Sequence, residues 1–187
     1  ARAPLVLRDE HDGVVTLTLN QPQRFNPLSE AMIASLTQHL DAVSVDANVR
    51  VVVLAARGAA FCAGHDLREM RAQPSSSYYK GLFQQCTQLM LGIVNCPVPV
   101  IARVQGLATA AGCQLVATCD LAVAADTARF AVSGVTLGLF CSTPSVALTR
   151  NVARKQAFEM LMTGEFIDAP TALRYALVNR IGPSQQL

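Results

Sequence analysis

The chain has 187 residues, of which 51% are apolar and only 15% are charged, a composition that suits a globular protein with a sizeable core. Its net charge is +2, and its Lys and Arg residues are scattered rather than clustered, which argues against nucleic acid as a partner. No apolar stretch reaches the roughly 18 residues of a membrane span, so we expect no membrane partner and one domain over residues 1–187.

The N-terminus lacks the charged-then-apolar pattern of a signal peptide. We therefore expect a cytoplasmic protein, or one of the mitochondrial matrix if a transit peptide has been removed. The cysteines form no CxxC pair and have no histidine at metal-ligand spacing, so we expect reduced thiols packed as small apolar residues and no metal site. These cysteines are Cys62, Cys86, Cys96, Cys113, Cys119 and Cys141.

In the first part of the chain, alternating residues predict a strand over Val14–Leu19 with one face open to water. Ser29 is a candidate N-cap for an amphipathic helix that runs to about Val43. An apolar run then predicts a buried strand over Val51–Ala55. The apolar stripe of the helix consists of Met32, Leu36, Leu40 and Val43.

The rest of the chain continues to alternate strands with helices, which predicts an α/β architecture with mostly parallel pairing. After a polar loop over 73–77, the helix predicted over Tyr78–Asn95 has an inward face of Leu82, Phe83, Cys86, Leu89, Met90 and Ile93. The later elements expected are strands over Val98–Val104, Leu121–Ala125, Ala128–Val132 and Val178–Ile181, and helices over Pro144–Val152, over Lys155–Met162 and after Asp168.

The stretch Phe61–Met70 is the first place where the sequence indicates chemistry. Small residues precede Asp66, which is a good helix N-cap, so a strand is expected to turn sharply into a helix there. Backbone N–H groups at such a turn face outward at the positive end of the helix dipole. They can hold an anion, or an oxygen on which negative charge develops.

A second corner of the same kind is expected where the strand Val98–Val104 ends and a helix opens at Ala110–Leu115. Gly112 and the alanines beside it permit close approach to the backbone. Two such corners can direct two N–H groups at one oxygen. The alternative is that both are ordinary tight corners whose small residues serve packing alone.

Residues 59–70 resemble the first signature of the crotonase (enoyl-CoA hydratase/isomerase) superfamily, and residues 99–115 together with 119–122 resemble its second. The likeness extends from about Val14 to Pro183. It implies a spiral of ββα turns, binding of an acyl-CoA thioester, and assembly as a homotrimer or hexamer. Members of the family continue with C-terminal helices, whereas this chain ends at Leu187, so we expect those helices to be truncated, disordered or absent.

The resemblance also implies an oxyanion hole made of the backbone N–H groups of His65 and Ala111, which would hold the thioester oxygen and stabilise an enolate. The imidazole of His65 either adds a proton donor or acceptor or is turned to solvent. The family places its two catalytic glutamates at positions that correspond to Gln114 and Gly134, where this chain has no carboxylate. Hydration by the usual mechanism is therefore doubtful.

Two further side chains are candidates for chemistry near these corners. Cys141 lies near a position where some family members carry a reactive side chain, and a following helix would favour its thiolate; the alternative is a buried structural thiol. Glu69 is the nearest carboxylate to the first corner, and its alternative is a solvated charge on a helix face.

The resemblance implies that coenzyme A enters only as part of the substrate, with no separate cofactor. Arg24 is a candidate partner for a phosphate, or else a solvated loop arginine. The substrate-binding positions implied by the family are Arg24, Phe25, Ala63, Gly64, Asp66 and Leu67.

These features predict an enzyme of the enoyl-CoA hydratase/isomerase type that acts on acyl-CoA thioesters through a stabilised enolate. A catalytically silent acyl-CoA-binding or scaffold protein is the main alternative, and the missing glutamates favour it. RNA binding, known for some relatives, is a third hypothesis, against which the absence of a basic helix argues.

Overall fold

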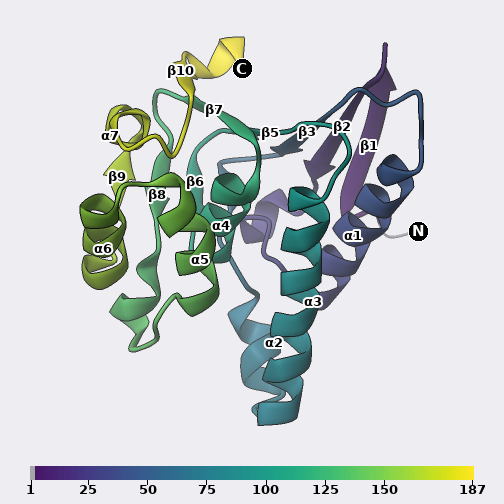
Figure 1. Ribbon diagram of the computed structural model, residues 1–187. Helices are drawn as coiled ribbons and strands as arrows, with labels where there is room; N and C mark the ends of the chain where they lie inside the picture. The colour runs from purple at the N-terminus through teal and green to yellow at the C-terminus, as the bar shows by residue number, and fades with distance from the viewer. Residues whose placement is uncertain (1–2) are drawn as a thin grey trace.

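The computed structural model describes residues 3–187 and confirms the α/β architecture (Figure 1). Six strands form the larger sheet in the order β1-β2-β3-β5-β7-β10, and every pairing except β1 with β2 is parallel. These strands are β1 (Val6–His11), β2 (Val14–Leu19), β3 (Val51–Ala56), β5 (Val100–Val104), β7 (Leu121–Ala125) and β10 (Arg180–Gly182).

A smaller sheet has the order β4-β6-β8-β9. Three strands of the larger sheet are each followed, after a few residues, by a strand of the smaller one, and a helix comes next. This repetition produces the ββα turns that the family resemblance implies. The strands of the smaller sheet are β4 (Ala60–Cys62), β6 (Leu107–Thr109), β8 (Arg129–Ala131) and β9 (Ile167–Asp168).

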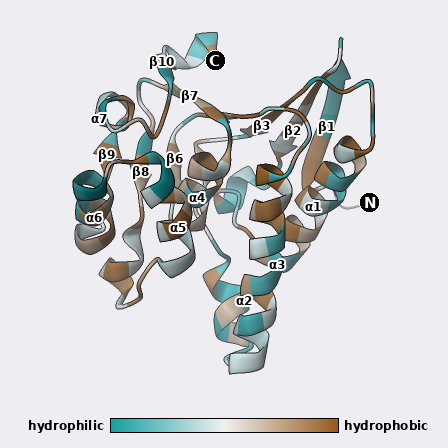
Figure 2. Cartoon of the chain, viewed as in Figure 1, coloured by the Kyte–Doolittle hydropathy of each residue, from teal (hydrophilic) through white to brown (hydrophobic). Residues whose placement is uncertain are grey.

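The core lies between the larger sheet and the helices α1 (Glu30–Ser44), α3 (Ser76–Val94) and α4 (Ala111–Thr118). Leu36 of α1 and Leu89 of α3 pack with Leu17, Val52 and Val100 of the sheet. In Figure 2 brown and teal residues alternate along α1 and α3, and β1 is brown at its start and teal toward its end. The apolar stripe predicted for the first helix is confirmed, because all of its members are buried.

Polar caps fix where three helices begin, as the sequence predicts. Ser29 accepts a hydrogen bond from the N–H of Met32 at 3.2 Å at the start of α1. Asp168 accepts one from the N–H of Thr171 at 2.8 Å at the start of α7 (Ala169–Arg174). Asp66 caps α2 (Leu67–Ala72) in the same way. The other helices are α5 (Ser142–Asn151) and α6 (Arg154–Thr163), with short 3-10 turns η1 (Pro22–Arg24), η2 (Ser133–Leu137) and η3 (Ser184–Gln186).

Several expectations need correction. The strand β1 and the three-residue strands β4 and β6 were not predicted; β4 and β6 are too short to show an alternating pattern. The helix predicted from Tyr78 begins at Ser76 instead, because the Ser75 side chain caps it through the N–H of Tyr78. Phe83, predicted to face inward, is 36% exposed.

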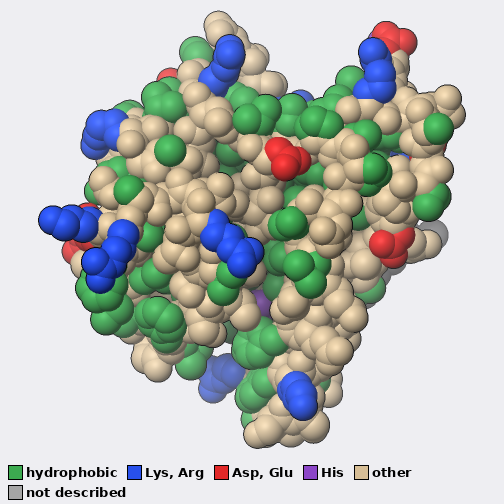
Figure 3. All heavy atoms as spheres, in the orientation of Figure 1, with side chains coloured by type: hydrophobic (Ala, Val, Ile, Leu, Met, Phe, Trp, Pro, Cys, Tyr) green, Lys and Arg blue, Asp and Glu red, His purple; other side chains and the backbone are tan. Residues whose placement is uncertain are grey.

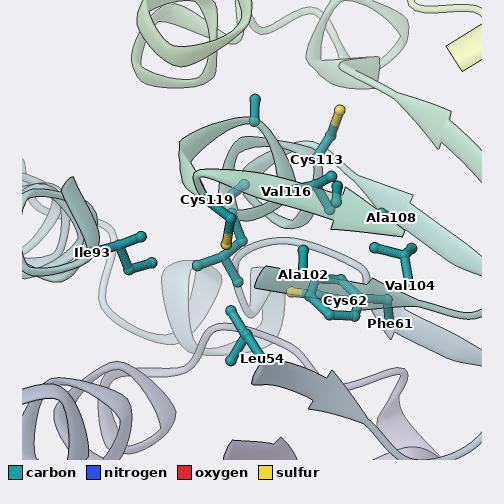
Figure 4. Packing of buried hydrophobic residues seen from close by; sticks show 14 of the residues in the cluster. Leu54, Phe61, Cys62, Ile93, Ala102, Val104, Ala108, Cys113, Val116 and Cys119 are labelled. Carbon is teal, nitrogen blue, oxygen red and sulfur yellow. The ribbon is translucent and has the colours of Figure 1, made fainter. Parts of the chain in front are cut away.

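All six cysteines are free thiols, and five of them are buried. Figure 4 shows Cys62 and Cys119 among apolar side chains near the sheet, whereas the side chain of Cys113 points away from them; all three belong to the buried hydrophobic cluster. Burial raises the pKa of Cys62 and of Cys113 to about 12. These thiols therefore pack as small apolar residues, as predicted.

Candidate functional site

The first corner, residues 62–67, joins β4 to α2. Gly64 has φ +91°, a conformation that residues with a side chain rarely adopt. Asp66 is 5% exposed, and its carboxylate accepts the N–H of Arg68 at 3.1 Å and that of Glu69 at 3.5 Å. These contacts confirm the predicted cap and hold His65 between a fixed glycine and a fixed helix start.

The second corner, residues 109–112, joins β6 to α4. Ala110 has φ 52° and ψ −121°, a conformation that favours glycine and costs an alanine on the order of 1 kcal/mol. The surrounding structure holds it there, because its N–H donates to the carbonyl of Ala131 at 2.9 Å and its own carbonyl accepts the N–H of Gln114 at 3.0 Å. Helix α4 consequently begins at Ala111. As a first-turn residue, Ala111 has an N–H with no acceptor within the helix.

The two corners are packed against each other through their glycines. A Cβ atom placed on Gly64 would lie 3.0 Å from the Cβ of Ala110 and 3.2 Å from the nitrogen of Ala111. One placed on Gly112 would lie 2.1 Å from the carbonyl oxygen of Cys62. Neither the amide of His65 nor that of Ala111 has a hydrogen-bond acceptor within residues 3–187.

A pocket of about 160 Å³ opens beside these corners, and we call it the corner pocket. Both corners contribute to its wall, through His65 and Ala111. The opposite wall comes from the segment between β8 and α5, which includes Gly134 and Cys141. The remaining lining side chains are mostly apolar, among them Leu67, Met70, Phe83, Leu137, Leu139 and Phe140.

The imidazole of His65 is part of this wall. It meets the ring of Phe83 edge-on, with the ring centroids 5.4 Å apart. Both ring nitrogens are buried without a hydrogen-bond partner, so the alternative in which the imidazole turns to solvent is wrong. Burial lowers the pKa of His65, although the backbone of Leu28 opposes the shift, so the ring is neutral at pH 7 with one nitrogen able to accept a proton.

The positions of the family's glutamates are occupied in different ways. Gln114 is 6% exposed, and its Oε1 has no hydrogen-bond partner. Its side chain lines a second pocket, between α3, α4 and α5, rather than the corner pocket. Gly134 does line the corner pocket, so the structure places only one of these two positions on its wall.

Cys141 occupies the space that a side chain at Gly134 would need. The N–H of Gly134 donates to Sγ of Cys141 at 3.2 Å, and a Cβ on Gly134 would lie 2.8 Å from that sulfur. Burial raises the pKa of Cys141, although the N–H of Gly134 opposes the shift. Of the two alternatives for Cys141, the buried structural thiol is therefore confirmed, and the thiolate favoured by the following helix is not, since desolvation outweighs it.

The predicted coenzyme A contacts lie together next to the first corner. Ala63 donates its N–H to the carbonyl of Phe25 at 3.0 Å, and Phe25 and Leu67 are 53% and 47% exposed. Arg24, however, is not a free loop arginine: its guanidinium contacts the carboxylate of Asp66 at 2.5 Å. Its side chain remains 39% exposed, so the outer N–H groups still face water.

Three residues, Glu69, Leu139 and Phe140, have roles that the sequence did not indicate. Glu69 accepts the N–H of Glu30 at 3.1 Å and so caps α1, which excludes the solvated charge expected for it. Leu139 and Phe140 form a wall of the pocket, but they lie in an irregular segment where no periodicity marks their direction. Only the departure of this segment from a helix or strand pattern could have pointed to it.

Residues 3–187 contain no group of three His, Cys, Asp or Glu residues that could hold a metal ion. No helix of that part of the chain is both long and apolar enough to span a bilayer.

Comparisons with known proteins agree with this architecture. The family model for enoyl-CoA hydratase/isomerase matches residues 9–187. A crystal structure of an enoyl-CoA hydratase from Mycobacterium smegmatis superposes with a TM-score of 0.97 at 63% sequence identity, covering 99% of this chain and 72% of that one. The crystal structure of human enoyl-CoA hydratase domain-containing protein 3 superposes with a TM-score of 0.94 at 46% identity, covering 97% and 72%.

Among curated proteins, the mitochondrial enoyl-CoA hydratase domain-containing protein 3 of Rattus norvegicus is 48% identical over 178 residues. That match covers 95% of this chain but 59% of the rat protein, so the chain spans about three fifths of the length of this relative. The match of the family model to nearly all of the chain, the superposition on solved members and the ββα repetition agree with one another. The chain belongs to the enoyl-CoA hydratase/isomerase family of the crotonase superfamily.

Proposed function

We propose that this chain binds an acyl-CoA thioester with its carbonyl oxygen between the backbone N–H groups of His65 and Ala111, and acts on it through a stabilised enolate. The observation that carries this proposal is the close contact between the two corners. A Cβ atom placed on Gly64 would lie only 3.2 Å from the backbone nitrogen of Ala111. His65 and Ala111, whose amides have no acceptor among residues 3–187, both line the corner pocket. A single donor of this kind is worth about 2.7 to 4 kcal/mol of barrier in other enzymes.

The missing carboxylates limit what can follow. Hydration requires a group that activates water and a group that protonates the α-carbon, and neither Gln114 nor Gly134 transfers a proton at neutral pH. The neutral imidazole of His65 lines the corner pocket and can accept a proton, whereas burial raises the pKa of Cys141, the other titratable residue in the lining. We therefore propose reactions in which one base both removes a proton to form the enolate and returns it at another carbon, such as isomerisation, ahead of hydration.

A catalytically silent acyl-CoA-binding or scaffold protein is the second candidate. The sulfur of Cys141 fills the space above Gly134, which favours this candidate because no side chain at that position can reach the substrate. Both candidates predict binding of the thioester, and they differ only in turnover.

The binding step can be tested by the vibrational spectrum of a bound thioester labelled with ¹³C at its carbonyl. Two N–H donors are expected to lower the carbonyl stretching frequency relative to the ligand in water. Ala111→Pro removes one donor at the first position of a helix, where proline is tolerated, and should abolish much of the shift. A bound thioester with the same frequency as in water would end the proposal.

Turnover separates the two candidates. Steady-state assays over enoyl-, dienoyl- and malonyl-type CoA thioesters should show conversion above that of an Ala111→Leu variant, whose bulk blocks the corner pocket. Conversion that His65→Gln abolishes would end the silent-binder hypothesis. Binding without any conversion above the Ala111→Leu background would end the enzyme hypothesis.

We also propose a homotrimer or hexamer, as the family resemblance implies, with sizing by light scattering as its test. The name of the rat relative supports the mitochondrial matrix rather than the cytoplasm, and cell fractionation tests this.

A further inference from the structure

The second pocket, between α3, α4 and α5, is not used by the proposed chemistry. We call it the α5 pocket; its volume is about 380 Å³. Its walls combine exposed apolar side chains, such as Leu91 and Val146, with polar ones. The polar lining groups include Thr87, Gln114, Thr143, Arg150 and Asn151.

The α5 pocket is adjacent to the corner pocket. Thr143, at the start of α5, lines both. Gln114 lies one helical turn beyond Ala111, so the α5 pocket begins next to the amide proposed to hold the thioester oxygen.

The pocket then leads away from the corners along α4 and α5. The side-chain amide of Asn151 donates to the carbonyl of Ala117 at 2.7 Å, which places the end of α5 beside the end of α4. At the other end, Ala111 at the start of α4 and Thr143 at the start of α5 both line the corner pocket. From Thr143 to Arg150 the helix rises about 10 Å, which is the length of a medium-chain acyl group.

The far end of the pocket carries a positive charge. Arg150 has no salt bridge and no side-chain hydrogen bond with any other residue of the described chain. Figure 3 shows this face, where several blue Lys and Arg side chains gather over α5 and α6. At the near end, the buried Oε1 of Gln114 lacks a hydrogen-bond partner, which indicates that a ligand or water completes the pocket there.

We infer that the α5 pocket receives the distal part of an acyl group that ends in a carboxylate, with Arg150 as its partner. The apolar side chains contact the methylene chain, and the guanidinium binds the terminal carboxylate. This inference rests on the proposed function, because the thioester must first be seated at the corners. It assigns the substrate class as the CoA thioesters of medium-chain dicarboxylic acids.

The test compares two ligands of equal chain length, suberoyl-CoA and octanoyl-CoA, by titration calorimetry on the wild type and on Arg150→Gln. Suberoyl-CoA is expected to bind the wild type more tightly, and Arg150→Gln is expected to weaken suberoyl-CoA about fivefold while leaving octanoyl-CoA unchanged. Arg154→Gln, another exposed arginine, is the matched control and should change neither.

The outcomes distinguish a wrong assignment of the α5 pocket from a wrong proposed function. Suppose that octanoyl-CoA binds the wild type, but Arg150→Gln weakens the binding of both ligands equally or changes the binding of neither. The assignment of the α5 pocket is then wrong, and the proposed function stands. If neither thioester binds the wild type, both fall together. Arg150→Lys keeps the charge and should recover part of the preference for suberoyl-CoA, which a merely structural role of Arg150 would not produce.

Discussion

The clash between a side chain at Gly134 and the sulfur of Cys141 gives a prediction that can be worked out from distances. Gly134→Ala places a Cβ 2.8 Å from Sγ of Cys141, well inside the 3.5 to 4.0 Å of an ordinary contact. Overpacking of this kind costs about 1 to 3 kcal/mol. The loss of glycine freedom in the unfolded chain offsets about 0.4 to 1 kcal/mol, so a net loss of about 1 kcal/mol in the free energy of unfolding is expected.

The same substitution should be tolerated once the sulfur is gone. In a Cys141→Ala background the nearest atoms to the new Cβ are the backbone nitrogen of residue 141 and the carbonyl oxygen of Leu139, both at 3.3 Å. Gly134→Ala should therefore be close to neutral there. Urea unfolding of the four proteins of this cycle measures the coupling, which we expect to be about 1 to 2 kcal/mol.

Gly92→Ala provides the matched control, because a Cβ on Gly92 would meet nothing within 4 Å. Gly92 is inside α3, so alanine should stabilise the protein by up to about 1 kcal/mol in either background. Additive effects of Gly134→Ala and Cys141→Ala within about 0.5 kcal/mol would refute the packing argument. Such additivity would also show that the Cys141 sulfur is not what excludes a side chain at position 134.

Three further outcomes follow from the burial of named groups. Because burial lowers the pKa of His65, the folded state binds fewer protons than the unfolded state. The free energy of unfolding should therefore fall as pH drops below the ordinary histidine pKa near 6.5. Urea unfolding at about pH 5.5 and 7.5 measures this loss, which His65→Gln should reduce. Asp66→Ala removes a helix cap and the partner of Arg24, so it should cost about 1 to 3 kcal/mol in unfolding free energy, whereas loss of less than 0.5 kcal/mol would contradict the role of this contact. Thiol titration of the native protein with a disulfide reagent should detect Cys96 alone, and a fast reaction of Cys141 would show that its thiol is not buried as described.

The sequence was sufficient for most of the framework. The strand over Val14–Leu19 was predicted from its alternation of side chains, and the helix after Ser29 from its cap and apolar stripe. Each of these signals comes from residues that lie close together in the sequence. The strands β4 and β6 did not follow, since three residues carry no period. Their place is set by pairing with each other, which is a non-local contact.

The site was predicted unevenly for a similar reason. The corners at His65 and Ala111 appear in the sequence as glycine, alanine and cap residues, which encode backbone shape. The contact between Cys141 and Gly134 and the ion pair of Arg24 with Asp66 join segments 7 and 42 residues apart. No sequence pattern reports such side-chain contacts, so the sequence left two alternatives open for Cys141, a thiolate or a buried thiol, and did not indicate Asp66 as the partner of Arg24.

The backbone of this site and its side chains are under different constraints. The amides of His65 and Ala111 owe their positions to Gly64, to the strained Ala110 and to Gly112, and none of these tolerates change without moving a corner. Gln114 and Gly134 are free of that constraint, because a side chain can be exchanged while the corner beneath it stays in place. An oxyanion-binding framework can thus persist while the groups that move protons are replaced. For this reason the reaction must be identified by testing the side chains that line the corner pocket. The carbonyl stretching frequency of a bound thioester reports on the two backbone amides whichever reaction is found.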